Sequence, residues 1–217
     1  MPKYLNIKNW NRKDHFNFFK DYDNPFFNIC LQLDVTKLFK FVKDQKLSFF
    51  TSLLYLSIKT ANEVQQFRWR IRDENVIIHD VVHAGSTVLN NDNETFSFCY
   101  FKYNPNFKHF AAHVSRELKD NQASGGKLDP QDFRDDMIHY SVLPWIAFNS
   151  ISHPRKFNQI DSVPKIVFGK YHRTENEIKM PISIEVHHGL MDGIHVARYL
   201  DLFQNYLNDS EKILTFK

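Results

Sequence analysis

The clearest pattern in the chain is an alternation of apolar and polar residues from Ile182 to His188. A period of two predicts a β-strand, whose successive side chains point to opposite faces. His188 therefore shares a face with the aliphatic residues of the run and stands where the strand is expected to end. If that face is buried, desolvation disfavours the imidazolium ion and keeps His188 neutral near pH 7. A general base requires that neutral form. A core histidine with a purely structural role is the simpler alternative.

Other segments show strand or helix periodicity. Apolar residues at helical spacing predict helices over 35–42, 49–64, 107–118 and 194–207. Alternation predicts strands over 27–33, 67–72, 76–78, 84–89 and 95–102, with a hairpin turn at 73–75.

A strand-like run over 138–151 contains Pro144. Proline in a sheet is confined to strand starts, edges and bulges. The irregularity could aim Ser141 and Trp145 at a site. An ordinary strand hydroxyl is the simpler interpretation of Ser141.

The composition excludes several classes of protein. The 217 residues suit one domain over 1–217, because no repeat or low-complexity linker indicates a boundary. A net charge of +3 is too small to indicate nucleic-acid binding. No apolar run approaches the roughly 18 residues that span a membrane, and no glycine-rich phosphate loop is present. Two distant cysteines and no evident signal peptide favour a reducing cytoplasm. The 21 phenylalanines hint at apolar surface shared between subunits.

A metal site is an alternative interpretation of His187, His188, Asp192 and His195. Zinc requires three or four convergent ligands. Adjacent histidines in a strand diverge, so only one of the pair could serve. We therefore expect no metal.

Arg12 stands at the expected start of a helix for which Asn11 is a candidate cap. The helix dipole disfavours a cation there, so the position favours an acidic partner. Asp192 is a candidate for that partner, and a solvated arginine is the alternative.

Residues 166–173 are predicted to form a strand that ends in basic residues, with Lys170 and Tyr171 in its second half. Cations beside an aromatic ring could hold the phosphates of an adenine nucleotide and stack on its base. A solvated strand end is the more ordinary interpretation.

The residues from His187 to Gly193 read HHGLMDG. This pattern resembles the HHxxxDG signature of the CoA-dependent acyltransferases, which dihydrolipoamide acyltransferases and peptide-synthetase condensation domains share. His195 narrows the resemblance to the chloramphenicol O-acetyltransferases. The segment Ser141–Trp145 resembles that family's Ser-x-Leu-Pro-Trp motif, and residues 8–16 resemble its amino-terminal segment.

The resemblance implies an α/β (α+β) two-layer sandwich, a mixed β-sheet with helices packed on one side, known as the CoA-dependent acyltransferase fold. It also implies a homotrimer with an active site at each subunit interface. The implied activity is O-acetylation of chloramphenicol or a related small molecule, with acetyl-CoA as co-substrate, and hence antibiotic resistance. A ligand-binding trimer with weak catalysis and an acyltransferase for dihydrolipoamide are the alternatives.

The resemblance also implies roles for individual residues. His188 would be the general base and Ser141 would stabilise the oxyanion, while Arg12 and Asp192 would pair to hold the turn. Lys170, Tyr171 and Trp145 would lie by CoA, and Phe19 and Phe27 would line the acceptor pocket. Phe19 stands where a tyrosine is usual, and Val167 where a threonine is usual. The acceptor could therefore differ from chloramphenicol.

Overall fold

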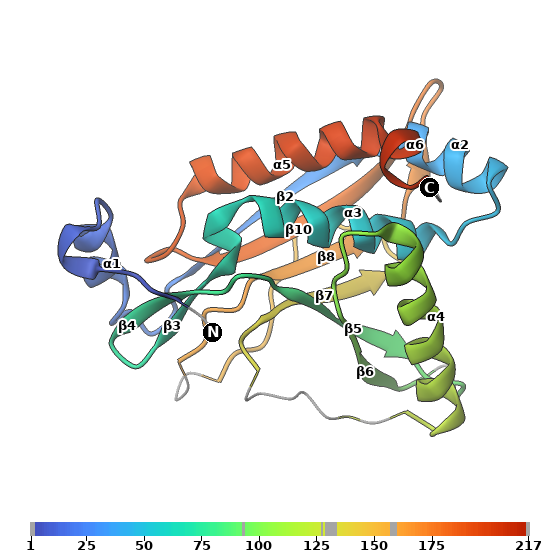
Figure 1. Ribbon diagram of the computed structural model, residues 1–217. Coiled ribbons are helices and arrows are strands. Elements are labelled where there is room, and N and C mark those ends of the chain that lie inside the picture. The colour runs from blue at the N-terminus through green and yellow to red at the C-terminus, as the bar shows by residue number, and fades with distance from the viewer. Residues whose placement is uncertain (1–2, 93, 127, 129–133, 157–159, 216–217) are drawn as a thin grey trace.

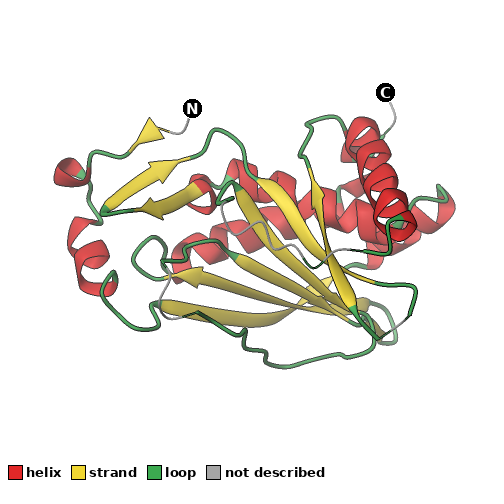
Figure 2. Cartoon of the chain, turned by 90° about the horizontal axis from the view of Figure 1, so that it is seen from below, coloured by secondary structure: helices red, strands yellow, loops and turns green. Residues whose placement is uncertain are grey.

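The computed structural model describes residues 3–92, 94–126, 128, 134–156 and 160–215. They form a large mixed β-sheet and a layer of helices on one of its faces (Figure 1, Figure 2). This arrangement confirms the expected two-layer α/β fold. The described part of the sheet has seven strands in the order β2-β10-β8-β7-β5-β6, with β9 paired to β10. Their bounds are β2 Phe26–Asp34, β5 His83–Leu89, β6 Phe96–Phe101, β7 Met137–Leu143, β8 Lys165–Gly169, β9 His172–Arg173 and β10 Ile178–His187.

The helices on the sheet occur close to where the apolar spacing predicts them. They are α2 Thr36–Asp44, α3 Phe49–Glu63, α4 Phe107–Ala123 and α5 Gly193–Asn208, followed by the short α6 Ser210–Ile213. Residues 51–58 of α3 are all buried, as a helix that is apolar on several sides should be. The Ser57 hydroxyl bonds to the hydroxyls of Tyr140 in β7 and Tyr199 in α5. This buried hydroxyl cluster joins two helices to the sheet.

Strand β10 lies inside the sheet and is buried on both faces. It pairs antiparallel with β2 on one side and with β8 and β9 on the other. Ile182, Ile184 and Val186 belong to the apolar core under the helices. The alternate residues point to the face without helices and are nonetheless at most 6% exposed. We call this second face the open face and define it by Thr87, Ser141, Lys165, Ser183, Glu185 and His187.

Strand β7 runs parallel to both of its neighbours, β5 and β8. It ends at Leu143, directly before Pro144. The strand-like run expected to continue to Ile151 therefore stops early, because proline cannot donate a ladder hydrogen bond.

A smaller antiparallel sheet lies beside the main one and has the order β1-β4-β3. Its strands are β1 Lys3–Tyr4, β3 Trp69–Arg72 and β4 Asn75–Ile78. The predicted hairpin is confirmed, although a 3₁₀ helix, η2 Gln65–Arg68, takes the first two residues of the expected strand. The fully buried Arg70 binds four backbone carbonyl groups, including those of Phe67 and Met137, and so attaches this sheet to β7.

The amino-terminal segment contains a 3₁₀ helix, η1 Ile7–Asn9, and α1 Lys13–Phe19. Arg12 is the residue at the cap position of α1, and no side chain caps that helix. The expected cap by Asn11 is therefore wrong. Within the described ranges, no helix is both long enough and apolar enough to cross a bilayer.

Replacing Ile184 with alanine tests the burial of β10. The side chain is 0% exposed, so we expect the cavity to lower the free energy of unfolding by about 3–4 kcal/mol. Denaturant unfolding followed by circular dichroism measures this change. The control is Ile194→Ala at a site 56% exposed, where we expect a change within about 0.5 kcal/mol. Equal losses at the two sites would contradict the burial of the strand.

Candidate active site

His188 is the first residue beyond β10 and begins the turn that leads to α5. Its backbone N–H donates to the carbonyl oxygen of Pro25, 2.7 Å away. The imidazole stacks on Phe19 with ring centres 4.1 Å apart and also contacts Phe27. The side chain is 36% exposed. The apolar face of the strand is buried as predicted, but His188 lies past its end and is partly exposed.

The hydrogen bonds of His188 determine which ring nitrogen carries the proton. Nδ1 lies 3.2 Å from the carbonyl oxygen of Met191 and 3.1 Å from Oδ1 of Asp192. Both oxygens are acceptors, so Nδ1 must carry the hydrogen. In the neutral ring, Nε2 then keeps its lone pair. This tautomer can accept a proton from a ligand.

The structure brings Arg12 and Asp192 together in an ion pair, as the sequence predicts. Arg12 is 8% exposed, and its Nη2 also donates to the carbonyl oxygen of His188 at 3.1 Å. Partial burial acts to raise the pKa of Asp192, but the hydrogen bond and charge of Arg12 outweigh it and leave that pKa below its usual value. Asp192 is therefore ionised at neutral pH, and its contacts with Arg12 and His188 stabilise the turn after β10.

The other two histidines of the signature are bound to the backbone. The Asp192 N–H donates to Nδ1 of His195 at 2.9 Å, and the Gly189 N–H donates to Nδ1 of His187 at 3.1 Å. His187 faces the open side of the sheet while His188 faces the helix side. In the described part of the chain, no three His, Cys, Asp or Glu residues gather closely enough to hold a metal ion.

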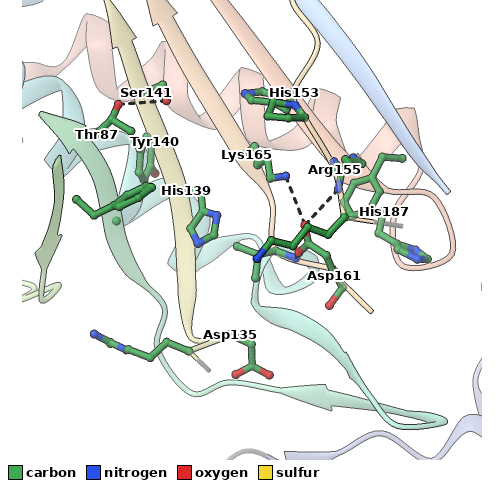
Figure 3. A pocket seen from close by; sticks show the side chains of 18 of the residues that line it. Thr87, Asp135, His139, Tyr140, Ser141, His153, Arg155, Asp161, Lys165 and His187 are labelled. Carbon is green, nitrogen blue, oxygen red and sulfur yellow. Dashed lines mark hydrogen bonds and ion pairs between the residues drawn. The ribbon is translucent and has the colours of Figure 1, made fainter. Parts of the chain in front are cut away.

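Ser141 lies on β7 and lines a cavity of about 1560 Å³ on the open face (Figure 3). The hydroxyl of Thr87 donates to Ser141 Oγ at 3.3 Å. Strand register places Ser141 level with Val167 of β8, which is level with Ser183 of β10. His188 is five residues beyond Ser183 and two strands away, so its Cα lies about 19 Å from that of Ser141. One chain does not bring these two residues together.

The three residues assigned to CoA by resemblance gather where β7 and β8 end. Trp145 is 60% exposed and lines the same cavity as Ser141. The Lys170 N–H donates to the carbonyl oxygen of Ile146. Tyr171 packs on Phe39 of α2 and on Phe49 of α3. Lys170 and Tyr171 lie near the beginning of β10, at the opposite end from His188.

The cavity contains a charged cluster that the sequence reasoning missed. Arg155 forms ion pairs with Glu185 and Asp161 and lies over the ring of Phe26. Lys165 is 3.4 Å from Asp161, and His153 is 3.0 Å from Glu185. Lys165 and Glu185 lie on neighbouring strands. Only their positions within those strands could have indicated that the two side chains share a face of the sheet. Arg155 comes from a loop without periodicity, so no sequence signal places it there.

Nearly the whole chain is similar to known proteins. The sequence matches the family described as chloramphenicol acetyltransferase over residues 3–204. A chloramphenicol acetyltransferase of Klebsiella sp is 30% identical, with 94% of this chain and 93% of the relative covered. A solved structure named chloramphenicol acetyltransferase has a TM-score of 0.87 and 28% identity, covering 95% of this chain and 100% of that chain. A dihydrolipoamide acetyltransferase of Azotobacter vinelandii has a TM-score of 0.71 at 16% identity, covering 93% and 88%, and shares the fold. The resemblance seen in the motifs is thus confirmed.

The buried histidines of the open face predict how stability depends on pH. Burial lowers the pKa of both His187 and His153 from 6.5 to about 4. Between these values the unfolded chain binds more protons than the folded one, so stability falls as pH falls from about 6.5 toward 4. Each histidine contributes a slope of up to about 1.4 kcal/mol per pH unit. We expect His187→Gln to reduce the slope of the unfolding free energy, measured by urea unfolding from pH 7 to pH 5.

The matched control for this experiment is His109→Gln, since His109 is exposed on α4. That variant should keep the slope of the unsubstituted protein. An unchanged slope in His187→Gln would show that folding does not lower the pKa of His187.

Proposed function

The chain belongs to the chloramphenicol acetyltransferase family, and we propose that it is an acetyl-CoA-dependent O-acetyltransferase acting on chloramphenicol or a related small molecule with a free hydroxyl. The tautomer of the His188 ring is the observation on which this proposal rests. Its Nδ1–H points at the Met191 carbonyl and Asp192, which leaves Nε2 as a base on a ring that solvent reaches.

The proposed reaction is a direct transfer within a ternary complex. Nε2 of His188 takes the proton from the acceptor hydroxyl while the hydroxyl oxygen attacks the thioester carbonyl carbon. Ser141 donates a hydrogen bond to the oxyanion that forms, an interaction typically worth about 3–4 kcal/mol. The C–S bond then breaks, and His188 returns the proton to the leaving thiolate. The products are the acetyl ester and free CoA.

In this scheme Arg12 and Asp192 position the base. The carboxylate of Asp192 approaches Nδ1 of His188, while Arg12 holds both that carboxylate and the His188 carbonyl. The contact of Arg12 fixes the backbone of His188, and the contact of Asp192 fixes the ring at Nδ1. Phe19 and Phe27 pack against the ring and would form the apolar wall next to the attacking hydroxyl.

We propose further that the site is completed by a second subunit of a homotrimer. The separation of about 19 Å between His188 and Ser141 supports a site built from His188 of one chain and the cavity of the next. Trp145, Lys170 and Tyr171 belong to the Ser141 side and would contact CoA there. Large apolar side chains exposed on the cavity wall, Trp145 and Phe96 among them, support an interface on this face.

A cytoplasmic location and a role in chloramphenicol resistance are part of this proposal. Both cysteines are free thiols, which suits a reducing compartment. A chloramphenicol-dependent release of CoA thiol from acetyl-CoA separates the enzyme from a ligand-binding trimer. Dihydrolipoamide in the same assay tests the other acceptor class.

Replacing His188 with alanine should lower kcat for thiol release by about 10³–10⁴-fold, because the base is lost. Steady-state kinetics with acetyl-CoA and chloramphenicol measure the loss, and size-exclusion chromatography with light scattering should show an unchanged trimer. The control is His109→Ala, which should keep full activity. Full activity in the His188 variant would refute the mechanism.

Mixing two inactive variants tests whether the site is shared between chains. Ser141→Ala should lose about 10²–10³-fold in kcat. When it is unfolded and refolded with an equal amount of His188→Ala, about a quarter of the interfaces in random trimers combine an intact His188 with an intact Ser141. We therefore expect about a quarter of the original activity, measured by thiol release.

The control mixture contains His188→Ala and Arg12→Ala, whose defects affect the same half of the site. It should give no more activity than its parents. If the first mixture also stays at the level of its parents, the two residues do not meet across an interface.

A further inference from the structure

Lys165 is the first residue of β8 and lines the same cavity as Ser141, with its ammonium group turned toward Asp161 (Figure 3). It is level with His139 of β7 and with Glu185 of β10, while Ser141 is level with Val167. Lys165 is thus two residues and one strand away from Ser141, so their Cα atoms lie about 8 Å apart. Both side chains belong to the open face. An ammonium group therefore shares the cavity with the proposed oxyanion donor.

The charges around Lys165 neutralise it only in part. Among the described residues, its carboxylate partner is Asp161, whose Oδ2 lies 3.4 Å from Nζ. The same oxygen is 3.2 Å from Nη1 of Arg155, and the other oxygen of Asp161 accepts the Val163 N–H at 2.9 Å. Glu185 is engaged by Arg155 and His153. One carboxylate thus serves two cations, and its contact with Lys165 is longer than a good hydrogen bond.

Burial makes this incomplete pairing costly. The Lys165 side chain is 15% exposed, and burial lowers its pKa, an effect that the charge of Asp161 opposes. An ammonium group has three N–H donors and no acceptor. The cavity therefore presents a cation with donor capacity left for a further anion. Asp161 is bound by Arg155 and by the Val163 N–H and therefore keeps its negative charge next to any ligand. For this reason a ligand with one negative charge suits the site better than a dianion.

We propose that Lys165 recognises a carboxylate on the acceptor, so that the preferred acceptors are small hydroxy acids rather than neutral alcohols. This inference rests on the proposed function, because it assumes that the reacting hydroxyl lies near Ser141. The carboxylate would bind Nζ a few bonds away from that hydroxyl. Chloramphenicol has no ionised group and would leave Lys165 desolvated without a new partner, which costs selectivity.

A matched pair of acceptors tests the proposal. Thiol release from acetyl-CoA is measured with 4-(hydroxymethyl)benzoate and with 4-(hydroxymethyl)benzamide, which differ in the carboxylate alone. We expect the protein to prefer the benzoate by about ten- to hundredfold in kcat/KM, mainly through KM, because a hydrogen bond to a charged group is gained. Lys165→Met should remove this preference and lower KM for chloramphenicol. Lys165→Arg, which keeps the charge, should retain a preference for the benzoate.

The matched control is Lys212→Met on the exposed α6, which should keep the preference. Equal kcat/KM for the two acceptors, or a preference that survives Lys165→Met, would overturn the proposal. If no acceptor, chloramphenicol included, releases thiol, the proposed function fails instead. Calorimetric titration with the same two compounds then still decides the role of Lys165. Tighter binding of the benzoate that is lost in Lys165→Met supports it, and equal or absent binding of the two compounds refutes it.

Discussion

The ion pair between Arg12 and Asp192 holds together the two segments on which the candidate site depends. Helix α1 buries a single residue, Phe16, and lies at the end of the molecule, away from the helix layer (Figure 1). The pair connects this segment to the turn after β10 across 180 residues of sequence. Arg12 also binds the His188 carbonyl. The orientation of the imidazole is therefore set by a long-range electrostatic contact as well as by the end of the strand.

Two adjacent histidines have opposite environments because a strand changes face at every residue. His187 is 3% exposed on the open face, and burial lowers its pKa to about 4. His188 lies on the other side, against Phe19 and Phe27, with a third of its side chain exposed. The first is thus a neutral structural residue, and the second is available for proton transfer. The distinction follows from the period of β10 rather than from residue type.

Local patterns predicted much of the fold and one half of the site. The alternation in β10 and the spacing in α3 and α5 were sufficient because each element buries a face of its own period. The expected pairing of Arg12 with Asp192 is present in the structure, and Asp192 also approaches the His188 ring within the turn that the signature forms. The predicted cap of α1 was wrong because Asn11 and Arg12 both lie at the start of the helix. The chemistry of their side chains does not decide which of the two takes the N-cap position.

Non-local features could not be predicted in the same way. The distance between Ser141 and His188 depends on the register of three strands, which the sequence does not state. The charged cluster depends on Arg155, which reaches Glu185 from a loop without periodicity. The alternation of apolar and polar residues in β10 is typical of a sheet with one solvated face. The structure instead buries Glu185 and His187 and surrounds them with charge.

In the proposed trimer, the position of this cluster would couple assembly to the choice of acceptor. The open face carries Ser141, Lys165 and the Arg155 network, and the helices cover the opposite face. A second subunit placed over the open face would remove more water from these charges, and electrostatic interactions strengthen as water is excluded. A cation that is partly neutralised in the single chain would then depend more strongly on any anion inside the cavity. Closing the site would therefore favour an acceptor that carries its own negative charge.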